Sequence, residues 1–463
     1  MSKPSINRRE FLQLSASAAA MLGLTGCAGV KINPLAWMRP RRPRPIAPGA
    51  KIRFANIGLS GKGYSDVRDF ADEHTVALCD TNWDQKEVKE TFAAFPNAKR
   101  YKDFRKMLLE LDDEIDAVVV SIPDHMHFLA AYMAISMGKH VYVQKPLTQT
   151  VGEARELLKL ARRHGVCTQM GNQGHAGDGI RMTREWIQAG LIGPVHEVHI
   201  WCNRPIWPQA MIKPPEPKPI PENLAWDLWL GHADTRPYGD GYQPFVWRGW
   251  RDFGSGALGD MGCHLIDGPF WALDLGSPLS VEAEFSGLTD LAFPEWSIIT
   301  YQFSARGAMP PLTLKWYDGG KMPPRPKDLE ASRDMKSECG SYMLGGKATL
   351  FDTSSYSNSP RVIPEAKMKE LRPLLPKKTI PRGPGNPNKE LTNAIRANNP
   401  ALAGSNFEYS VPLTETVLLG NLAIFAGKKI EWDGPNMRVT NCPAVNKFVN
   451  PTYRKGWKPR DLA

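Results

Sequence analysis

A glycine-rich turn and a distant carboxylate are the first residues in this 463-residue sequence whose types and spacing indicate chemistry. The turn follows an apolar run, and its residues are Gly58, Leu59, Ser60, Gly61, Lys62 and Gly63. Asp80 ends the next apolar run, about twenty residues later. Backbone N–H groups of such a turn bind a pyrophosphate, and an acid at this distance binds the adenosine ribose. The spacing predicts a dinucleotide site, with NAD favoured by Asp80 and NADP as the alternative.

The turn departs from the usual G-x-G-x-x-G pattern, because Ser60 replaces the glycine that lets the pyrophosphate approach. Gly61 beside it can restore this room. A coincidental turn is the alternative interpretation, but a strand before the turn, a helix after it and Asp80 favour the nucleotide site. Pro123 and His127, at a later strand exit, are further predicted cofactor contacts.

Alternating strands and helices are expected to position these residues. The expected strands are 51–58, 75–80, 115–123, 138–146 and 166–170, and helical patterns begin at residue 64 and cover 126–137 and 151–164. Continuous apolar strands separated by helices are typical of parallel sheets that are buried on both faces. We therefore predict an α/β protein whose N-terminal domain, residues 50–171, is a doubly wound Rossmann domain.

Two motifs resemble the Gfo/Idh/MocA family of oxidoreductases. Residues 138–147 are similar to its Glu-Lys-Pro hallmark, although Gln144 replaces the glutamate before Lys145. Asp260 and His264 match the second hallmark, an acid four residues before a histidine. The resemblance covers roughly residues 50–435. It implies binding of a nicotinamide dinucleotide, a sugar or polyol substrate, and a homo-oligomer.

The resemblance also implies a C-terminal α/β domain with an open, mainly antiparallel sheet, here residues 172–463. Alternating patterns in 195–201 and 312–316 fit half-buried strands of such a sheet. Insertions rich in proline near 204–250 and 318–387 carry no fold signal of their own.

The resemblance assigns roles to three residues of the types that alcohol oxidation requires. His264 is the acid/base, because an imidazole can take and return a proton near neutrality. Lys145 stabilises developing alkoxide charge and relays a proton, and Asp260 orients His264 or a substrate hydroxyl. Without the family match, a core histidine and a solvated lysine would be the simpler interpretations.

Five further residues are candidate substrate contacts. Asn172 and His175 follow the last Rossmann strand, where ligands gather in such sheets, and can contact substrate or nicotinamide. Arg248 and Trp250 precede the acid-histidine motif and could bind a sugar ring, although a Trp-rich segment is as often core. Asp267 follows the same motif.

The N-terminal residues 1–27 match processing signals. Arg8 and Arg9 resemble the twin-arginine export motif, and residues 24–27 resemble a lipobox whose Cys27 is lipidated. A frayed amphipathic terminus is the alternative. Because twin-arginine export machinery carries folded proteins, the cargo could bring along a tightly bound dinucleotide. The signals predict a periplasmic or cell-surface lipoprotein that meets the membrane through its lipid anchor only.

The net charge of +10 does not by itself indicate a nucleic-acid partner. Residues 31–53 carry only basic charges and many prolines, so we expect 28–49 to be an extended linker facing a membrane, with a DNA-binding arm as the alternative. We saw no apolar segment of the ~20 residues that a spanning helix needs. Two ordinary cores fit this length.

Cysteines give no metal signal. Apart from Cys27, six remain and none forms a C-x-x-C pair, so we predict no metal site. Cys79, Cys167 and Cys202 lie in strand-like runs and are expected as buried thiols, although an oxidising compartment would permit a disulfide.

Three functions fit these residues. The first is an NAD(P)-dependent sugar or polyol dehydrogenase. The second is a redox-neutral enzyme that oxidises a glycoside transiently, eliminates a leaving group and regenerates its cofactor. The third is a non-catalytic sugar-binding lipoprotein, which would fit Ser60 and Gln144 but not an intact Lys145, Asp260 and His264.

Overall fold

The computed structural model describes residues 40–336 and 338–462. The expected signal, with Cys27, and residues 28–39 of the expected linker lie outside this part. Residues 40–49 contain no helix or strand, yet they are packed on the following domain. Arg41 pairs with Asp112 at 2.7 Å, and Arg44 donates to the carbonyl oxygen of Ile115 at 2.8 Å. This part of the predicted linker is therefore held in place, because its arginines find acceptors on that domain.

Within the described residues, the first sheet has six parallel strands in the order β3-β2-β1-β4-β5-β6. They are β1 (Arg53–Ile57), β2 (His74–Cys79), β3 (Lys99–Tyr101), β4 (Ala117–Val120), β5 (His140–Val143) and β6 (Thr168–Met170). The helices between them are α2 (Lys62–Asp69), α3 (Lys86–Ala94), α4 (Phe104–Glu110), α5 (Asp124–Ser136) and α6 (Val151–His164). The central strand β4 is buried throughout, as expected of an apolar strand covered on both faces. The Rossmann sheet is confirmed.

The second sheet, in the described part of the chain, has nine strands in the order β13-β12-β11-β7-β10-β9-β8-β14-β15. They are β7 (Val195–Cys202), β8 (Ser280–Phe285), β9 (Ser297–Phe303), β10 (Leu312–Tyr317), β11 (Cys339–Gly345), β12 (Thr349–Asp352), β13 (Arg361–Ile363), β14 (Ile430–Asp433) and β15 (Arg438–Val439). Only β7 and β10 pair in parallel, so the predicted mainly antiparallel sheet is confirmed.

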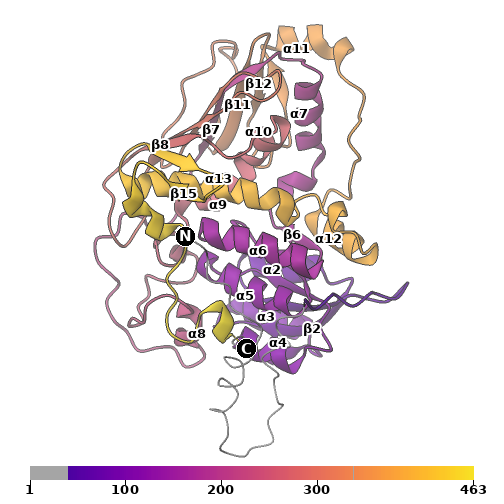
Figure 1. The fold of residues 1–463 in the computed structure, drawn as a ribbon, viewed down its shortest axis with the longest axis vertical. Helices are drawn as coiled ribbons and strands as arrows, with labels where there is room; N and C mark the ends of the chain where they lie inside the picture. Colours follow the sequence, from indigo (N-terminus) through magenta and orange to yellow (C-terminus); the bar gives the residue numbers. More distant parts are fainter. Residues whose placement is uncertain (1–39, 337, 463) are drawn as a thin grey trace, which may run out of the picture. The chain divides into compact units, whose positions relative to one another are not determined.

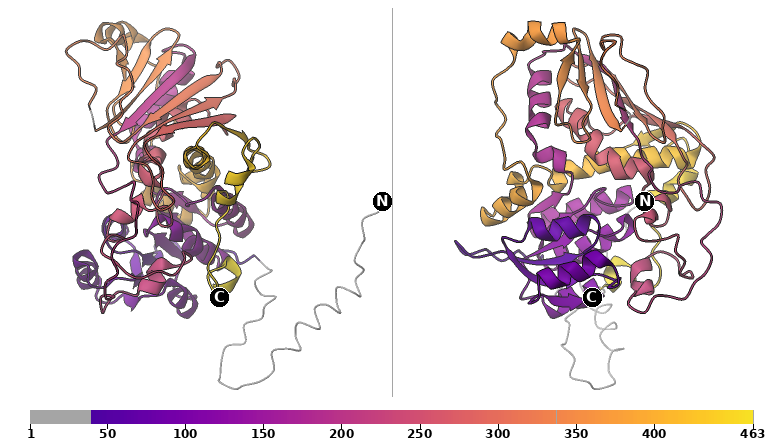
Figure 2. Two further views of the ribbon diagram at one scale, coloured as in Figure 1. Left: turned by 90° about the vertical axis from the view of Figure 1, so that its left-hand side faces the viewer. Right: turned by 180° about the vertical axis from the view of Figure 1, so that it is seen from behind.

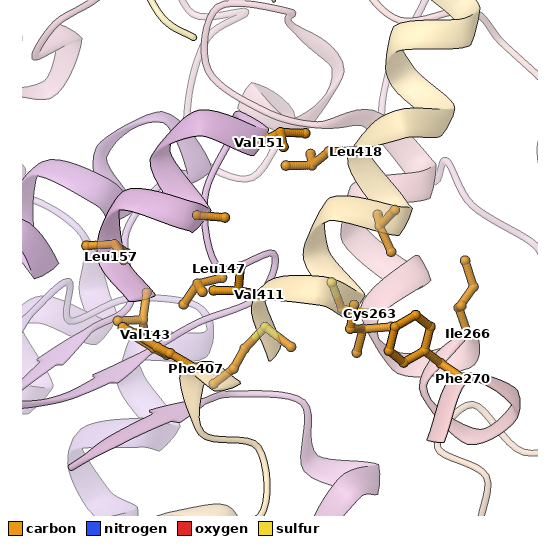
Figure 3. Packing of buried hydrophobic residues seen from close by; sticks show 14 of the residues in the cluster. Val143, Leu147, Val151, Leu157, Cys263, Ile266, Phe270, Phe407, Val411 and Leu418 are labelled. Carbon is orange, nitrogen blue, oxygen red and sulfur yellow. The ribbon is translucent and has the colours of Figure 1, made fainter. Parts of the chain in front are cut away.

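The remaining helices are α7 (Asp178–Gln188), α8 (Trp226–Leu230), α9 (Gly256–Leu265), α10 (Asp267–Ala272), α11 (Glu365–Leu371), α12 (Pro387–Arg396) and α13 (Phe407–Ala426). Helix α13 lies between the two sheets (Figures 1 and 2). Its Phe407, Val411 and Leu418 belong to one apolar cluster with residues of β5 and α6 and of α9 and α10 (Figure 3). One buried core therefore joins the two domains.

Helix α13 is also the one described helix that is long and apolar enough to cross a membrane. From the sequence, we predict no such segment. In the structure, 78% of its apolar window is buried inside the fold, which explains its composition as that of a core helix.

Segments beyond residue 171 return to the Rossmann domain. Leu391 and Ile395 of α12 pack with Ile52 and Phe54 in one apolar cluster. Near the C-terminus, Trp457 lies 4.1 Å beneath the guanidinium of Arg105. The predicted boundary at 171/172 divides the sequence. In space, however, α12 and the C-terminal segment, which follow that boundary, pack on the Rossmann domain.

Candidate active site

A cavity of about 680 Å³ opens beyond the carboxyl ends of β1, β2, β4 and β5. Ligands bind at this edge of doubly wound sheets. All three predicted catalytic residues line the cavity, and so do the predicted cofactor contacts other than Gly63: Lys145, Asp260, His264, Gly58, Ser60, Gly61, Lys62, Asp80, Pro123 and His127. The volume lies within the range of small-molecule sites.

Two glycines of the turn allow close packing, and the third leaves open space. A Cβ at Gly58 would lie 2.1 Å from the carbonyl oxygen of Ser121, and one at Gly63 would lie 2.3 Å from that of Gly58. Gly61 has φ +57°, and no described atom lies within 4 Å of its Cβ position. The room that Ser60 removes from the usual pattern is therefore present at Gly61.

The turn already binds a carboxylate. The Gly61 N–H donates to Glu87 Oε2 at 2.5 Å, where Glu87 comes from the first turn of α3 and lines the cavity. Asp80 Oδ2 accepts from the Leu59 N–H at 2.9 Å. Burial raises the pKa of Asp80 to about 6, against the effect of its hydrogen bonds from Asn82 and Leu59. The Gly61 N–H, which here binds the Glu87 carboxylate, can bind the pyrophosphate of a dinucleotide, and Asp80 at the end of β2 can bind its ribose. The residues therefore fit NAD.

Lys145, which follows β5, and Asp260, on α9, form an ion pair at the cavity. Lys145 Nζ lies 3.0 Å from Asp260 Oδ1 and donates to its backbone oxygen at 2.6 Å. Arg248 Nε lies 3.2 Å from Oδ1, and Arg204 Nε lies 3.6 Å from Oδ2. Burial would raise the pKa of Asp260, but Lys145 and Arg248 outweigh it and hold that pKa well below its usual range. Three cations thus surround one ionised carboxylate.

His264 lies one turn after Asp260 on α9 and is buried at the same cavity. Burial and then the charge of Lys145 lower the pKa of His264 well below its usual value, so the ring is neutral near pH 7. Its ring packs edge-on against Tyr356, with centroids 4.9 Å apart. Its buried Nδ1 finds no hydrogen-bond partner in the described part of the protein. The neutral imidazole is the form that can accept a proton, although the charge of Lys145 makes it a weaker base than a free histidine.

Gln144 contacts a carboxylate instead of supplying one. Its Nε2 donates to Asp66 Oδ2 at 2.8 Å, and the Ser121 hydroxyl donates to the same oxygen at 2.7 Å. Lys62 Nζ lies 2.5 Å from Asp66 Oδ1. Asp66 is fully buried on α2. The carboxylate near the end of the strand before Lys145 is therefore that of Asp66 on α2, and not that of a glutamate at position 144.

Several predicted contacts lie elsewhere. Asp267 accepts hydrogen bonds from Asn172 Nδ2 at 2.9 Å and from the Tyr409 hydroxyl, and it meets His175 Nδ1 at 2.9 Å. As far as the described residues show, these residues do not line the cavity. Trp250 is also outside it, in an aromatic cluster where its Nε1 donates to the Gly241 carbonyl. Their contact with substrate stays a prediction.

Arg248 and His127 both line the cavity, and neighbouring groups hold both side chains. Arg248 lies over the ring of Trp247, 4.3 Å from its centroid. His127 is fixed by the backbone, since its Nδ1 and Nε2 lie 2.8 and 2.7 Å from the carbonyl oxygens of Pro146 and Ile122. Burial lowers the pKa of His127 to about 4. His127 therefore links the segment after β4 to the segment after β5.

The cavity residues that sequence reasoning missed include Asp124, Arg204 and Tyr356. Asp124 begins α5 directly after Pro123, so its place after a parallel strand could have revealed it. Burial raises the pKa of Asp124 to about 7, although Arg248 lowers it. Arg204 follows β7 inside an insertion, and Tyr356 follows β12, and neither position carries a motif.

A Rossmann domain whose strand ends share a cavity with a lysine, an acid and a histidine defines a dinucleotide-dependent oxidoreductase. Residues 52–172 match the family model for the oxidoreductase family, NAD-binding Rossmann fold, and residues 201–309 match the model of its C-terminal alpha/beta domain. The chain belongs to the Gfo/Idh/MocA oxidoreductase family.

Individual relatives agree with this assignment. An uncharacterised oxidoreductase of Schizosaccharomyces pombe is 31% identical over 199 residues, which is 42% of each chain. An alpha-N-acetylgalactosaminidase of Shewanella oneidensis is 29% identical over 210 residues, 41% of this chain and 44% of that protein. The matched region thus spans about two fifths of the length of these curated relatives.

Solved structures show the same fold. The WlbA dehydrogenase from Bordetella pertussis, in complex with NADH and UDP-GlcNAcA, has a TM-score of 0.57 at 17% identity and covers 82% of this chain and 99% of its own. The aldose-aldose oxidoreductase from Caulobacter crescentus has a TM-score of 0.55 at 15% identity and covers 82% and 100%.

Proposed function

We propose that this protein is an NAD-dependent oxidoreductase that acts on a ring or chain hydroxyl of a sugar, glycoside or polyol. The observation that carries the proposal is the single cavity shared by the glycine turn, Asp80, Lys145 and His264. Two domains supply these groups, so a hydroxyl-bearing substrate would lie between the Rossmann strand ends and α9. Bound NAD would supply the hydride acceptor or donor.

The protein's own residues would handle the proton and the charge. Neutral His264 takes the proton of the substrate hydroxyl during oxidation and returns it during reduction. Lys145 stabilises the developing alkoxide by its positive charge. Asp260 holds the Lys145 ammonium in place through the 3.0 Å contact.

A second candidate is redox-neutral cleavage of a glycoside. One relative is named an alpha-N-acetylgalactosaminidase, and several others are named family 109 glycosyl hydrolases. In this reaction a transient ketone acidifies the neighbouring C–H, and a leaving group departs by elimination. Asp124 favours this candidate, because its pKa of about 7 provides a partly protonated carboxyl that could protonate a leaving oxygen. A non-catalytic sugar-binding lipoprotein is the third alternative.

The test begins with the purified protein. We expect denaturation to release NAD, identified by mass spectrometry, or the stripped protein to bind NADH with a fluorescence change. Keto-sugar formed together with NADH, from a panel of sugars and glycosides, supports the dehydrogenase, whereas aglycone release without net NADH selects the cleavage reaction. Failure to bind either dinucleotide overturns both.

His264→Ala tests the assignment of the base. We expect a loss of about 10²- to 10⁴-fold in kcat with NADH affinity unchanged. His196→Ala is the matched control, since His196 lies on exposed β7 surface away from the cavity. Full turnover of His264→Ala would remove the assignment.

We also propose twin-arginine export, lipidation at Cys27 and residence in the periplasm or at the cell surface. The support is the sequence of residues 1–27. Cells fed a labelled fatty acid should label the protein, and Cys27→Ser should abolish the label. Replacing Arg8 and Arg9 by lysine should leave the precursor in the cytoplasm. An unlabelled mature protein would refute the anchor.

A homo-oligomer is proposed through the outer face of the second sheet. Strand β9 alternates buried and half-buried residues, so one face of this sheet is accessible in the single chain. Light scattering of the purified protein measures its mass, and a monomer at micromolar concentration would contradict the proposal.

A further inference from the structure

Two cysteines face each other across adjacent strands of the second sheet. Cys202 is the last residue of β7 and Cys339 the first of β11, and the two are direct partners in the antiparallel register. Their sulfur atoms lie 3.3 Å apart, and both side chains are buried. The sequence predicts a buried thiol at Cys202 but does not identify its partner.

The backbone around this pair has the geometry that a disulfide requires. The Asn203 N–H donates to the Glu338 carbonyl at 2.7 Å, so residues 203 and 338 form a hydrogen-bonded pair. Cys202 and Cys339, one step further along, are then a non-hydrogen-bonded pair, whose Cα atoms lie roughly 4.5 Å apart. This separation falls within the range of about 4.4 to 6.8 Å found for disulfides.

We propose that Cys202 and Cys339 are a dithiol modification site, which is converted to an intramolecular disulfide by exchange with a small-molecule or protein disulfide. The proposal goes beyond the oxidoreductase activity and does not depend on it. Cys339 thiolate attacks the oxidant and releases one thiol, forming a mixed disulfide. Cys202 then loses its proton and attacks the Cys339 sulfur, which releases the second thiol. The two cysteines lose two protons and two electrons, and the oxidant disulfide gains them.

The surroundings of the pair assign the order of these steps. The hydrogen bond from Cys202, aided by Ser355, lowers the pKa of Cys339 against the effect of burial. The same hydrogen bond and burial raise the pKa of Cys202, so Cys202 keeps its proton. Cys339 is accordingly the first nucleophile and Cys202 the resolving thiol, once local opening of the two strand ends admits the oxidant to the buried Cys339.

The disulfide would fix two walls of the active-site cavity. Cys202 lies two residues before Arg204, which contacts Asp260. Cys339 contacts Ser355, and the next residue, Tyr356, packs on His264. We expect the bond to restrain residues 203–206 and 355–356, because the strands that carry them are joined at their ends.

The experiment uses the full-length protein reduced and then treated with 2-hydroxyethyl disulfide, followed by alkylation of the remaining thiols and peptide mass spectrometry. We expect a cross-linked peptide containing Cys202 and Cys339 and a loss of about 2 Da from the intact mass, which dithiothreitol reverses. We also expect slower amide hydrogen exchange in 203–206 for the oxidised form.

Cys202→Ser should abolish the cross-link and leave Cys339 as a mixed disulfide with the oxidant. Cys442→Ser is the matched control and should leave the cross-link unchanged, because Cys442 is half-buried and far along the chain. The wild-type measurement stands alone if Cys202→Ser fails to fold. Complete alkylation of both cysteines after oxidation, or a cross-link from either to another cysteine, overturns the proposal.

Discussion

Gln144 is the neutral hydrogen-bond partner of the buried Asp66 carboxylate near the strand end that carries Lys145. Gln144 donates to Asp66 at 2.8 Å, and both side chains are almost fully buried. A glutamate at position 144 would set a second carboxylate against the first, and two such groups cannot both ionise at this distance without a cost. The amide therefore suits this chain because Asp66 already supplies the charge.

Gln144→Glu is accordingly expected to destabilise the protein, although it restores the family hallmark. We expect the free energy of unfolding to fall by about 3 to 5 kcal/mol at pH 8, as for an uncompensated buried charge. The loss should shrink at pH 5, because the carboxylate pair can then hold a proton. Urea unfolding at the two pH values measures both effects.

The double variant Asp66→Asn/Gln144→Glu is the control for this interpretation, because it exchanges the two groups. It should recover most of the lost stability, and the two substitutions should be strongly non-additive. Additive losses of stability would show that the side chains at positions 66 and 144 do not interact.

Glu87 competes with a dinucleotide for the glycine turn. Its carboxylate accepts the Gly61 N–H that a phosphate oxygen would use, and like charges repel. Glu87→Gln should lower the Kd for NADH by about two- to fivefold, the size of a surface charge effect. Fluorescence titration of the stripped protein measures the Kd, with Glu90→Gln on the same helix as the control. An unchanged or weaker affinity for Glu87→Gln would contradict this account.

The site residues that the sequence predicted share one property: each belongs to a local motif. Lys145 follows a strand, and Asp260 and His264 lie four apart on one helix, so short-range pattern identifies them. Arg204 and Tyr356 reach the cavity only because β7 and β12 are neighbours of β11 in the sheet. Such long-range pairing leaves no local signal.

Helix α6 carries a buried acid whose ionisation opposes folding. Glu153 completes a capping box with Thr150, and the Tyr453 hydroxyl also donates to it at 3.2 Å. Burial raises the pKa of Glu153 to about 7, although hydrogen bonds from Thr150 and Tyr453 lower it. The folded protein therefore binds this proton more tightly than the unfolded chain, and stability from this group is lost as pH rises from about 4.5 to 7.

Glu153→Gln should remove that loss while keeping the capping hydrogen bonds. We expect the variant and the wild type to have similar stability near pH 4.5. By pH 8 the variant should gain an advantage of at most about 3 kcal/mol, seen as a higher Tm. Glu156→Gln, an exposed position on the same helix, should show no pH-dependent difference. A constant difference at all pH values would refute the role of ionisation.

Strands were predicted at some of the places where apolar residues run or alternate, as in β4 and β10, whereas β8 and β9, which also alternate, and β11 were missed. Strand β11 contains Gly340 and Ser341 and lies in the proline-rich region 318–387, which also holds β12, β13 and α11. These strands are specified by their partners: Gly340, for example, admits the ring of Trp201 from β7, which a Cβ would meet at 2.3 Å. The intrinsic β-strand propensity of a residue does not reveal such packing between strands.

The arrangement of the two domains depends on α13, which no sequence motif marks. It is apolar on nearly all sides because it packs against α6 of the Rossmann domain and against α9 of the second domain. The predicted catalytic residues come from both domains, Lys145 from the end of β5 and His264 from α9, and α13 packs in the core that joins these domains. Two ion pairs join α6 to α13: Arg155 with Glu415, and Arg162 with Glu408.

These two pairs differ in burial and so allow a matched comparison. Arg155 binds Glu415 through two contacts of 2.7 Å, and the Glu415 side chain is 5% exposed. Arg162 binds Glu408 in the same two-point manner, but both side chains are more than half exposed. Removing one partner of a buried pair leaves an uncompensated charge, whereas an exposed partner is readily hydrated.

Arg155→Met should lower the free energy of unfolding by about 3 kcal/mol, and Arg162→Met by less than about 1 kcal/mol. Adding Glu415→Gln to Arg155→Met should restore much of the loss, because it removes the stranded charge. Because one core joins both domains, we expect each variant to unfold in a single transition. Urea unfolding monitored by fluorescence and by circular dichroism measures this transition. Equal losses for the two arginines, or separate transitions for the two domains, would show that α6 and α13 do not couple the domains in this way.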